Sequence, residues 1–146
     1  MEITTELVKQ LVRDQFPQWK ELEIYPVTNS GHDNCTFHLG NTMTVRLPSG
    51  KEYAAQVQKE NQWLPYLQEH LDYPISKPIA AGVPTHEYPF PWSINVWIDG
   101  ETLLTCPHID KKRFAKDLSA ALEKLQAVDC YGGQKPASTI FIEAAI

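Results

Sequence analysis

The chain has 146 residues, 42% of them hydrophobic and 21% charged, a composition that suits one globular domain, or a piece of one, and excludes a disordered tail. Its formal net charge is -5, whereas a surface that follows nucleic-acid phosphates needs clustered positive charge, so we expect no nucleic-acid partner. No apolar run approaches the length of a membrane span, and residues 1–5 lack the features of a signal peptide, so we expect a cytoplasmic protein with no membrane partner.

The first half of the chain predicts a helix followed by an antiparallel meander. Apolar residues recur at helical spacing over 5–16, and Pro17 stops that helix. Alternating apolar and polar residues then predict strands at 22–27, 34–39 and 42–47. Gly40 and Asn41 separate the last two strands and suit a two-residue hairpin, with glycine where the backbone needs a positive φ.

The second half predicts another helix, two more strands and a final helix. Helical spacing continues over 52–71, although Pro65 must kink this helix or start a new turn. Short apolar runs at 79–83 and 92–98 predict the fourth and fifth strands, and apolar residues on one side of 110–128 predict the last helix. The order of elements is therefore that of an α+β domain.

Glu60 is the most informative single position. It lies three residues after Val57 and four before Leu64, which places a carboxylate on the apolar side of its helix, and a buried carboxylate needs a partner. Arg46, on the strand face opposite Val45, is the nearest basic candidate, and its guanidinium could pair with Glu60 while offering other donors to a phosphate. A purely structural ion pair, or a Glu60 in contact with water, is equally compatible with the periodicity.

The polar loop between the first two strands carries little information by itself. Its single glycine matches neither a dinucleotide-binding fingerprint nor a Walker motif, so an ordinary polar connection is the simpler interpretation. His32, Asp33 and His38 have no spacing typical of a zinc site, so we assign no metal ligands.

Taken together, five short strings resemble the N-terminal half of the aminoglycoside phosphotransferase family, whose members are small-molecule kinases with a protein-kinase-like fold. The strings are Gly31-His32-Asp33-Asn34, Val45-Arg46-Leu47-Pro48, Glu60-Asn61-Gln62-Trp63-Leu64-Pro65, Tyr88-Pro89-Phe90-Pro91-Trp92-Ser93 and Trp97-Ile98-Asp99-Gly100-Glu101. Each string is weak alone, but their combination and order are specific. The resemblance covers roughly residues 5–129.

The resemblance implies an α+β fold with the architecture of a protein-kinase-like N-terminal lobe. This lobe has a five-stranded antiparallel sheet, a lead-in helix, and a helix after the third strand. We accordingly expect a nucleotide-binding lobe at 1–98, a hinge and linker at 99–109, and the start of a truncated C-terminal lobe at 110–146.

The same resemblance implies which residues contact the nucleotide phosphates. The loop expected to cover them consists of Ser30, Gly31, His32, Asp33 and Asn34. Arg46 takes the strand position where kinases usually have a lysine for the α- and β-phosphates, and Glu60 is its partner on the helix. The arginine keeps the charge but changes the geometry of the phosphate contact.

The resemblance also implies an adenine pocket at the end of the fifth strand. Asn95 is expected at the back of this pocket, and the backbone groups of Val96 and Ile98, two residues apart, are expected at the adenine edge. Trp92 and Trp97 are expected to pack in the protein rather than to bind a ligand.

The implied activity is ATP-dependent phosphoryl transfer to a small-molecule hydroxyl. ATP with Mg²⁺ is the implied co-substrate, and the magnesium ligands and acceptor site are expected in the C-terminal lobe of an intact enzyme. The family's H-G-D-x-x-x-x-N catalytic loop does not occur in the 146 residues, so we assign no catalytic residue and expect no activity from this chain alone.

A different class of function is also open. The lobe could be a non-catalytic binding or regulatory module that associates with itself through the surface exposed between the lobes. An enzyme that uses Asp33 and Glu60 as paired carboxylates has no support beyond the presence of the two residues.

Overall fold

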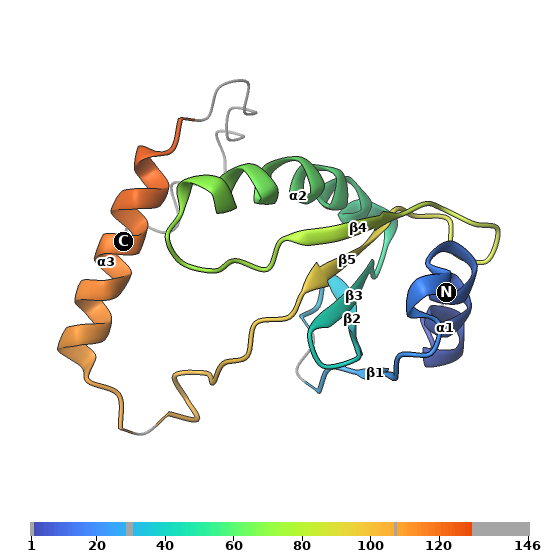
Figure 1. Ribbon diagram of the computed structural model, residues 1–146, viewed down its shortest axis with the longest axis horizontal. Helices are drawn as coiled ribbons and strands as arrows, with labels where there is room; N and C mark the ends of the chain where they lie inside the picture. The colour runs from blue at the N-terminus through green and yellow to red at the C-terminus, as the bar shows by residue number, and fades with distance from the viewer. Residues whose placement is uncertain (1, 29–30, 107, 130–146) are drawn as a thin grey trace. The chain divides into compact units, whose positions relative to one another are not determined.

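The computed structural model describes residues 2–28, 31–106 and 108–129 (Figure 1). These residues form two compact units, one ending at Ile109 and the other beginning at Asp110. The elements in chain order are α1 (Thr5–Gln15), the short 3-10 helix η1 (Pro17–Trp19), β1 (Ile24–Pro26), β2 (Asn34–Leu39), β3 (Met43–Pro48), α2 (Lys51–His70), β4 (Pro78–Gly82), β5 (Trp92–Val96) and α3 (Lys111–Ala127). Of the elements in the described residues, α3 alone belongs to the second unit.

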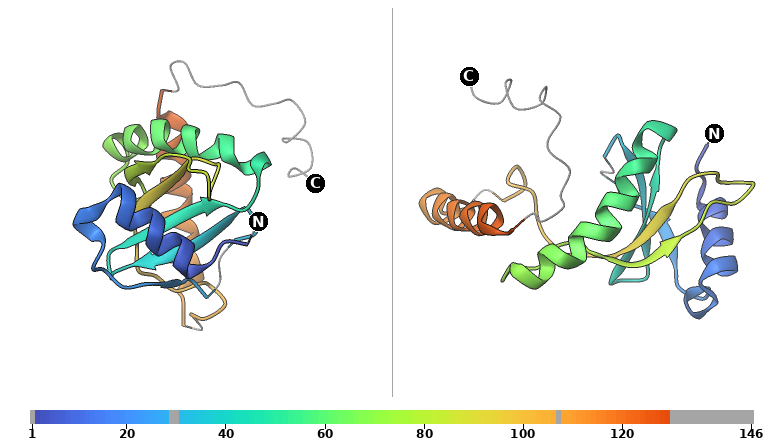
Figure 2. Two further views of the ribbon diagram at one scale, coloured as in Figure 1. Left: turned by 90° about the vertical axis from the view of Figure 1, so that its right-hand side faces the viewer. Right: turned by 90° about the horizontal axis from the view of Figure 1, so that it is seen from above.

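The first unit is built on a five-stranded antiparallel sheet with the order β1-β2-β3-β5-β4. This confirms the predicted sheet and its two accompanying helices. The helices α1 and α2 lie on opposite faces of the sheet (Figure 2). Among the described residues, no helix is both long and apolar enough to cross a membrane.

The hydrophobic core lies between α1 and one face of the sheet. Val8, Leu11 and Val12 of α1 are buried there, because their spacing puts them on one side of the helix. Strand alternation supplies the other half of this core: Phe37, Leu39, Val45, Leu47, Trp92 and Ile94. The core consequently holds the β2–β3–β5 part of the sheet in place.

The opposite face of the sheet is polar. Residues that alternate with the core positions point to this side: Thr36 and His38 of β2, Thr44 and Arg46 of β3, and Ser93 and Asn95 of β5. Helix α2 contacts β3, β4 and β5. Thr44, Ser93 and Asn95 are buried although they are polar. A buried polar face beside a helix is unusual in a structural core and favours a binding site.

The β2–β3 connection differs from the predicted two-residue hairpin. Leu39 pairs with Met43, so the loop contains the three residues 40–42. Gly40 has φ 60°, as expected for a residue in the left-handed region, and its N–H donates to the carbonyl of Glu23 at 2.8 Å. A three-residue loop with glycine in this conformation keeps the alternation of both strands in register.

Other element boundaries shift by a few residues from the prediction. β1 has only 3 residues, because its register with β2 ends at Pro26, and β5 ends at Val96 rather than at Ile98. Helix α2 runs through Pro65 as one element of 20 residues. Its proline removes one intrahelical hydrogen bond, and the packing of α2 on the sheet is sufficient to keep the helix continuous.

The loop between β4 and β5 is attached to the sheet by Tyr88. This side chain is fully buried, and its hydroxyl donates to the carbonyl of Pro48 at 2.8 Å. Burial raises the pKa of Tyr88 well above its usual range, so the hydroxyl stays protonated and remains a donor.

Helix α3 is amphipathic but has no buried residue. The Asp110 carboxylate caps it by accepting from the N–H groups of Lys112 and Arg113 at 3.0 and 3.1 Å. Its apolar side, formed by Phe114, Leu118, Leu122 and Leu125, is between 37% and 48% exposed.

Candidate functional site

An ion pair between Arg46 and Glu60 marks the centre of the candidate site. Arg46 lies in β3 on the polar face of the sheet, and Glu60 lies on α2. The Nη1 atom of Arg46 is 2.7 Å from Oε2 of Glu60, and Nη2 is 3.5 Å from Oε1. The side chains are 24% and 18% exposed, so solvent screens this pair less than a surface pair. The structure therefore contains the pairing that the family resemblance implied and that periodicity alone left open.

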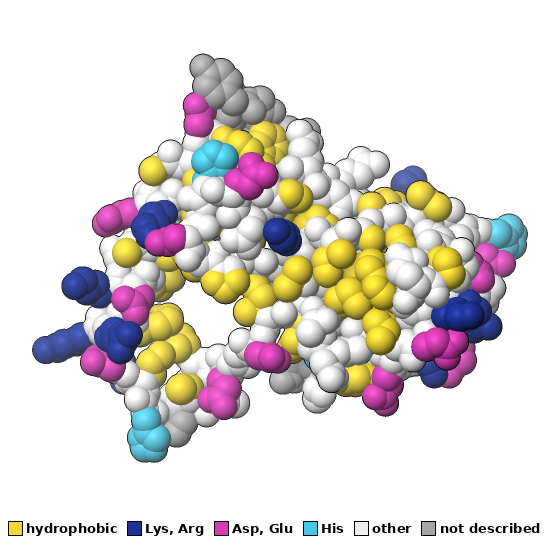
Figure 3. All heavy atoms as spheres, in the orientation of Figure 1, with side chains coloured by type: hydrophobic (Ala, Val, Ile, Leu, Met, Phe, Trp, Pro, Cys, Tyr) yellow, Lys and Arg dark blue, Asp and Glu magenta, His cyan; other side chains and the backbone are white. Residues whose placement is uncertain are grey.

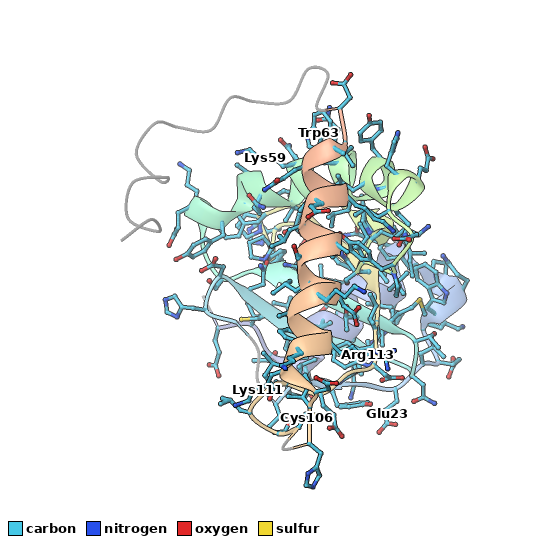
Figure 4. All side chains as sticks on the ribbon, turned by 90° about the vertical axis from the view of Figure 1, so that its left-hand side faces the viewer. Glu23, Lys59, Trp63, Cys106, Lys111 and Arg113 are labelled. Atoms are coloured by element: carbon cyan, nitrogen blue, oxygen red, sulfur yellow. The ribbon has the colours of Figure 1, made fainter. Side chains whose placement is uncertain are left out.

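A cavity of about 300 Å³ opens beside this ion pair. Its wall combines the start of β2 with one side of α2, and it includes Asp33, Asn34, Arg46, Tyr53, Lys59 and Glu60. Lys59 lies on α2, where Figure 4 labels it. Two of the Arg46 nitrogens are engaged by Glu60, and the guanidinium has five N–H donors. The remaining donors can bind an anion in this cavity.

The loop before β2 lies at the mouth of the same cavity. Ser30 is outside the described residues. Gly31, His32 and Asp33 are exposed, and Asn34 is half-buried at the beginning of β2. The hydroxyl of Ser49 donates to the carbonyls of His32 and Asp33 at 2.9 and 3.1 Å. Ser49 therefore anchors the loop to the end of β3, close to the ion pair.

At the C-terminal end of β5, polar groups of Asn95 and Val96 form hydrogen bonds with Ser76 and Lys77. Asn95 is fully buried, its Nδ2 donates to the carbonyl of Ser76 at 3.4 Å, and its Oδ1 has no partner among the described residues. The Val96 N–H donates to Lys77 at 2.9 Å, and the Val96 carbonyl accepts from the Ser76 hydroxyl at 2.8 Å. Val96 and Ile98 therefore differ in their predicted role at the adenine edge. The N–H of Val96 already donates to Lys77.

Sequence reasoning missed an aromatic row on the polar face. The Tyr25 and His38 rings stack with centroids 4.7 Å apart, and the edge of Trp97 approaches His38 at 4.5 Å. Trp92 is fully buried, as expected for a packing residue, but Trp97 is only half-buried. The alternation that places Arg46 also places Tyr25 and His38 on this face, and this signal was present in the sequence.

Charged and metal-ligating side chains are distributed over the described surface. Lysine, arginine and acidic side chains are interspersed on the face shown in Figure 3, without one large positive patch. Within the described ranges, no group of three or more histidine, cysteine, aspartate or glutamate side chains is arranged to hold a metal ion.

Solved structures with a similar fold are aminoglycoside phosphotransferases. The chain superposes on the GDP complex of wild-type aminoglycoside 2'-phosphotransferase-IIIa with a TM-score of 0.76 and 20% identity, covering 87% of this chain and 43% of that one. It superposes on the streptomycin-ATP-APH(2")-IIa ternary complex with a TM-score of 0.58 and 19% identity, covering 88% and 42% of the two chains. Both likenesses establish the same fold.

The chain thus spans less than half the length of these solved relatives. No curated protein matches it. A family model described as the phosphotransferase enzyme family matches residues 25–140, which is most of the chain and includes the ion pair, the loop and the end of β5. The chain therefore belongs to the phosphotransferase enzyme family.

Proposed function

We propose that this chain is the nucleotide-binding lobe of a kinase that transfers a phosphoryl group from ATP to a small-molecule hydroxyl. The observation that carries the proposal is the Arg46–Glu60 pair beside a cavity that the loop before β2 adjoins. In this proposal residues 1–98 form the nucleotide-binding lobe, 99–109 the hinge, and 110–146 the beginning of a second lobe. A cytoplasmic location, where ATP is available, fits this role.

Arg46 is the proposed contact to the α- and β-phosphates. Glu60 holds two guanidinium nitrogens, so the side chain enters the site already oriented, which reduces the entropy lost when a phosphate binds. Charge-assisted hydrogen bonds from the remaining donors bind phosphate oxygens, while residues 30–34 cover the phosphates. Lys59 lines the same cavity and adds a second positive charge.

The proposed base site lies at the end of β5. Asn95 closes its back, and Ile98, which is an exposed residue, lies at its edge. The Val96 N–H is engaged by Lys77, so Val96 can contribute only the second lone pair of its carbonyl. We propose Mg²⁺ as part of the ATP co-substrate and assign no residue of this chain as its ligand.

Catalysis and acceptor binding are not assigned to residues of this chain. Relatives with this fold were solved with GDP, with ATP and streptomycin, and with gentamicin. By analogy the acceptor is a small molecule that carries hydroxyl groups. Because the sequence lacks a His-Gly-Asp string, we propose that this chain alone binds nucleotide and does not transfer phosphate.

Replacing Arg46 by glutamine tests the phosphate contact. We expect Arg46→Gln to weaken ATP binding roughly 10- to 100-fold, because it removes the charge-assisted bonds. Adenosine affinity is expected to change little, since adenosine has no phosphate. Isothermal titration with both ligands measures the difference.

The matched control is Arg13→Gln, which removes the same charge from an exposed position on α1, on the other face of the sheet. Arg46→Lys is expected to recover part of the ATP affinity. If Arg46→Gln and Arg13→Gln bind ATP equally well, Arg46 does not contact the phosphates.

The second candidate is a non-catalytic module that associates with a copy of itself. The exposed apolar side of α3 favours this candidate, because exposed apolar patches promote association. Sedimentation velocity at increasing protein concentration is then expected to show a rising sedimentation coefficient, which Leu118→Ser should abolish. If the protein is a monomer at every concentration, and if its ATP binding depends on the contact of Arg46 with the phosphates, the results favour the nucleotide-binding lobe.

A further inference from the structure

We infer that a second cavity, between α2 and β4, binds a small neutral molecule that has an apolar body and one hydrogen-bond donor, such as a hydroxyl or N–H group. This cavity has a volume of about 190 Å³ and is lined by Asn61, Pro65, Pro78, Ile79, Ala80 and Ala81. It shares no lining residue with the cavity beside the Arg46–Glu60 pair. The inference therefore does not depend on the proposed nucleotide binding.

A short side chain and a bulge in β4 leave this space open. Helix α2 lies along β4 (Figure 1), and the two elements are in contact. The ladder with β5 passes from Pro78 to Ala80, so Ile79 is an extra residue in a bulge. Ala81 pairs with Ser93 on the polar face of the sheet and extends only one side-chain carbon toward α2. The space between helix and strand is consequently not filled by the residues that border it.

Asn61 supplies the polar group of the cavity. Its Oδ1 atom is buried and has no hydrogen-bond partner among the described residues. Buried polar groups in proteins nearly always have a partner, because an unpaired one loses its hydration without compensation. A ligand that donates a hydrogen bond to Oδ1 restores that compensation.

The proline inside α2 adds a second acceptor at the same residue. Pro65 has no N–H, so the Asn61 carbonyl, four residues earlier, lacks the donor that an uninterrupted helix supplies. Both residues line the cavity. One residue thus has a side-chain acceptor and a main-chain acceptor beside a space that is otherwise apolar.

The lining determines the class of ligand. None of its six residues is charged, and burying an ion without a partner is costly, so the ligand is neutral. A water molecule occupies only about 30 Å³ and needs roughly two to four polar partners, which the apolar walls do not offer. An apolar cavity of about 150 Å³ accepts a molecule of the size of benzene. A molecule of the size of phenol therefore matches the volume and the polarity of this cavity.

Phenol and toluene are the probes for the test, because they have nearly the same shape and only phenol has a donor. A two-dimensional NMR titration locates each ligand from the amide signals of α2 and β4 and gives its Kd. We expect both ligands to bind at the cavity, and Asn61→Leu to lower the ratio of phenol affinity to toluene affinity roughly tenfold, the effect of one buried hydrogen bond. Comparing this ratio between two proteins cancels the difference in hydration of the two ligands.

Gln62→Leu is the matched control for Asn61→Leu. It introduces the same side chain at an exposed position of α2 that does not line the cavity, so the ratio is expected to stay unchanged. Ala81→Leu is expected to fill the space and to weaken the binding of both ligands roughly tenfold or more. Urea unfolding of each variant verifies that it is folded.

Three results would overturn the inference. If neither ligand gives a saturable shift of the α2 and β4 signals, the cavity holds only water. If Asn61→Leu keeps the wild-type ratio, Oδ1 of Asn61 does not accept from the ligand. If folded Ala81→Leu binds both ligands as tightly as wild type, the ligands bind elsewhere. None of these results bears on the ATP binding that Arg46→Gln tests, so the two proposals fail separately.

Discussion

Gly82→Ala is expected to destabilise the first unit by about 1–3 kcal/mol, the cost of forcing extra atoms into a packed core. Gly82 pairs with Trp92 between β4 and β5, and a Cβ atom at this position would overlap the indole ring of Trp92. Trp92 is completely buried and packs edge-on against Phe16, so its ring has little room to move. Position 82 needs glycine because there is no room for a Cβ atom beside the indole. Alanine at this position must displace Trp92, the largest side chain of the core.

The control for this change is Gly100→Ala. Apart from its chain neighbours, no atom of the described residues lies within 4 Å of the position that its Cβ would take, so this substitution is expected to be neutral or slightly stabilising. Urea unfolding followed by tryptophan fluorescence gives the free energy of unfolding of both variants. Equal stabilities for Gly82→Ala and Gly100→Ala would show that the core accommodates the methyl group and that Trp92 is not packed as described.

Glu60→Ala is expected to reduce the free energy of unfolding by about 1–3 kcal/mol, because it leaves the mostly buried Arg46 guanidinium without its anionic partner. Glu69→Ala is the matched control, since it removes an exposed carboxylate from the same helix. Glu69 lies in the last turn of α2, where a negative charge is not favoured by the helix dipole, so its removal is expected to cost nothing.

A double-mutant cycle isolates the interaction of the pair. The coupling energy from Glu60→Ala, Arg46→Ala and the double variant is expected to be favourable, and the double variant is expected to be more stable than the sum of the single changes predicts. If Glu60→Ala and Glu69→Ala have the same unfolding midpoint, the pair contributes nothing to the fold, and Glu60 serves only to orient Arg46.

Local patterns were sufficient to predict the elements that carry the site. In β3, the alternation of Val45, Arg46 and Leu47 separates core residues from the arginine, and the spacing around Glu60 places it on the inner side of α2. Both patterns depend only on the periods of a strand and a helix, which neighbouring residues determine. These periods left the pairing of Arg46 with Glu60 open, and the family resemblance implied it; in the structure, a short connection between β3 and α2 brings the two residues together.

Patterns of this kind did not predict the ends of the elements or the partners of backbone groups. The three-residue loop at 40–42 depends on the register of Leu39 with Met43, and the ladder of β5 with β3 ends at the pair Val96–Met43. The Val96 N–H is bound by Lys77, which precedes β4. These features depend on which backbone groups pair with one another, and periodicity within a single element does not determine that pairing.

The sequence by itself determined the α+β class, the order of the strands along the chain, and the identities of the arginine and glutamate at the centre of the candidate site. Only the tertiary structure decided that Tyr25, His38 and Trp97, which come from three separate segments, form one row on the face of the sheet that carries Arg46. The physical reason is that side-chain direction repeats within an element and is readable locally, whereas the meeting of side chains from different elements depends on strand register and packing across the whole sheet.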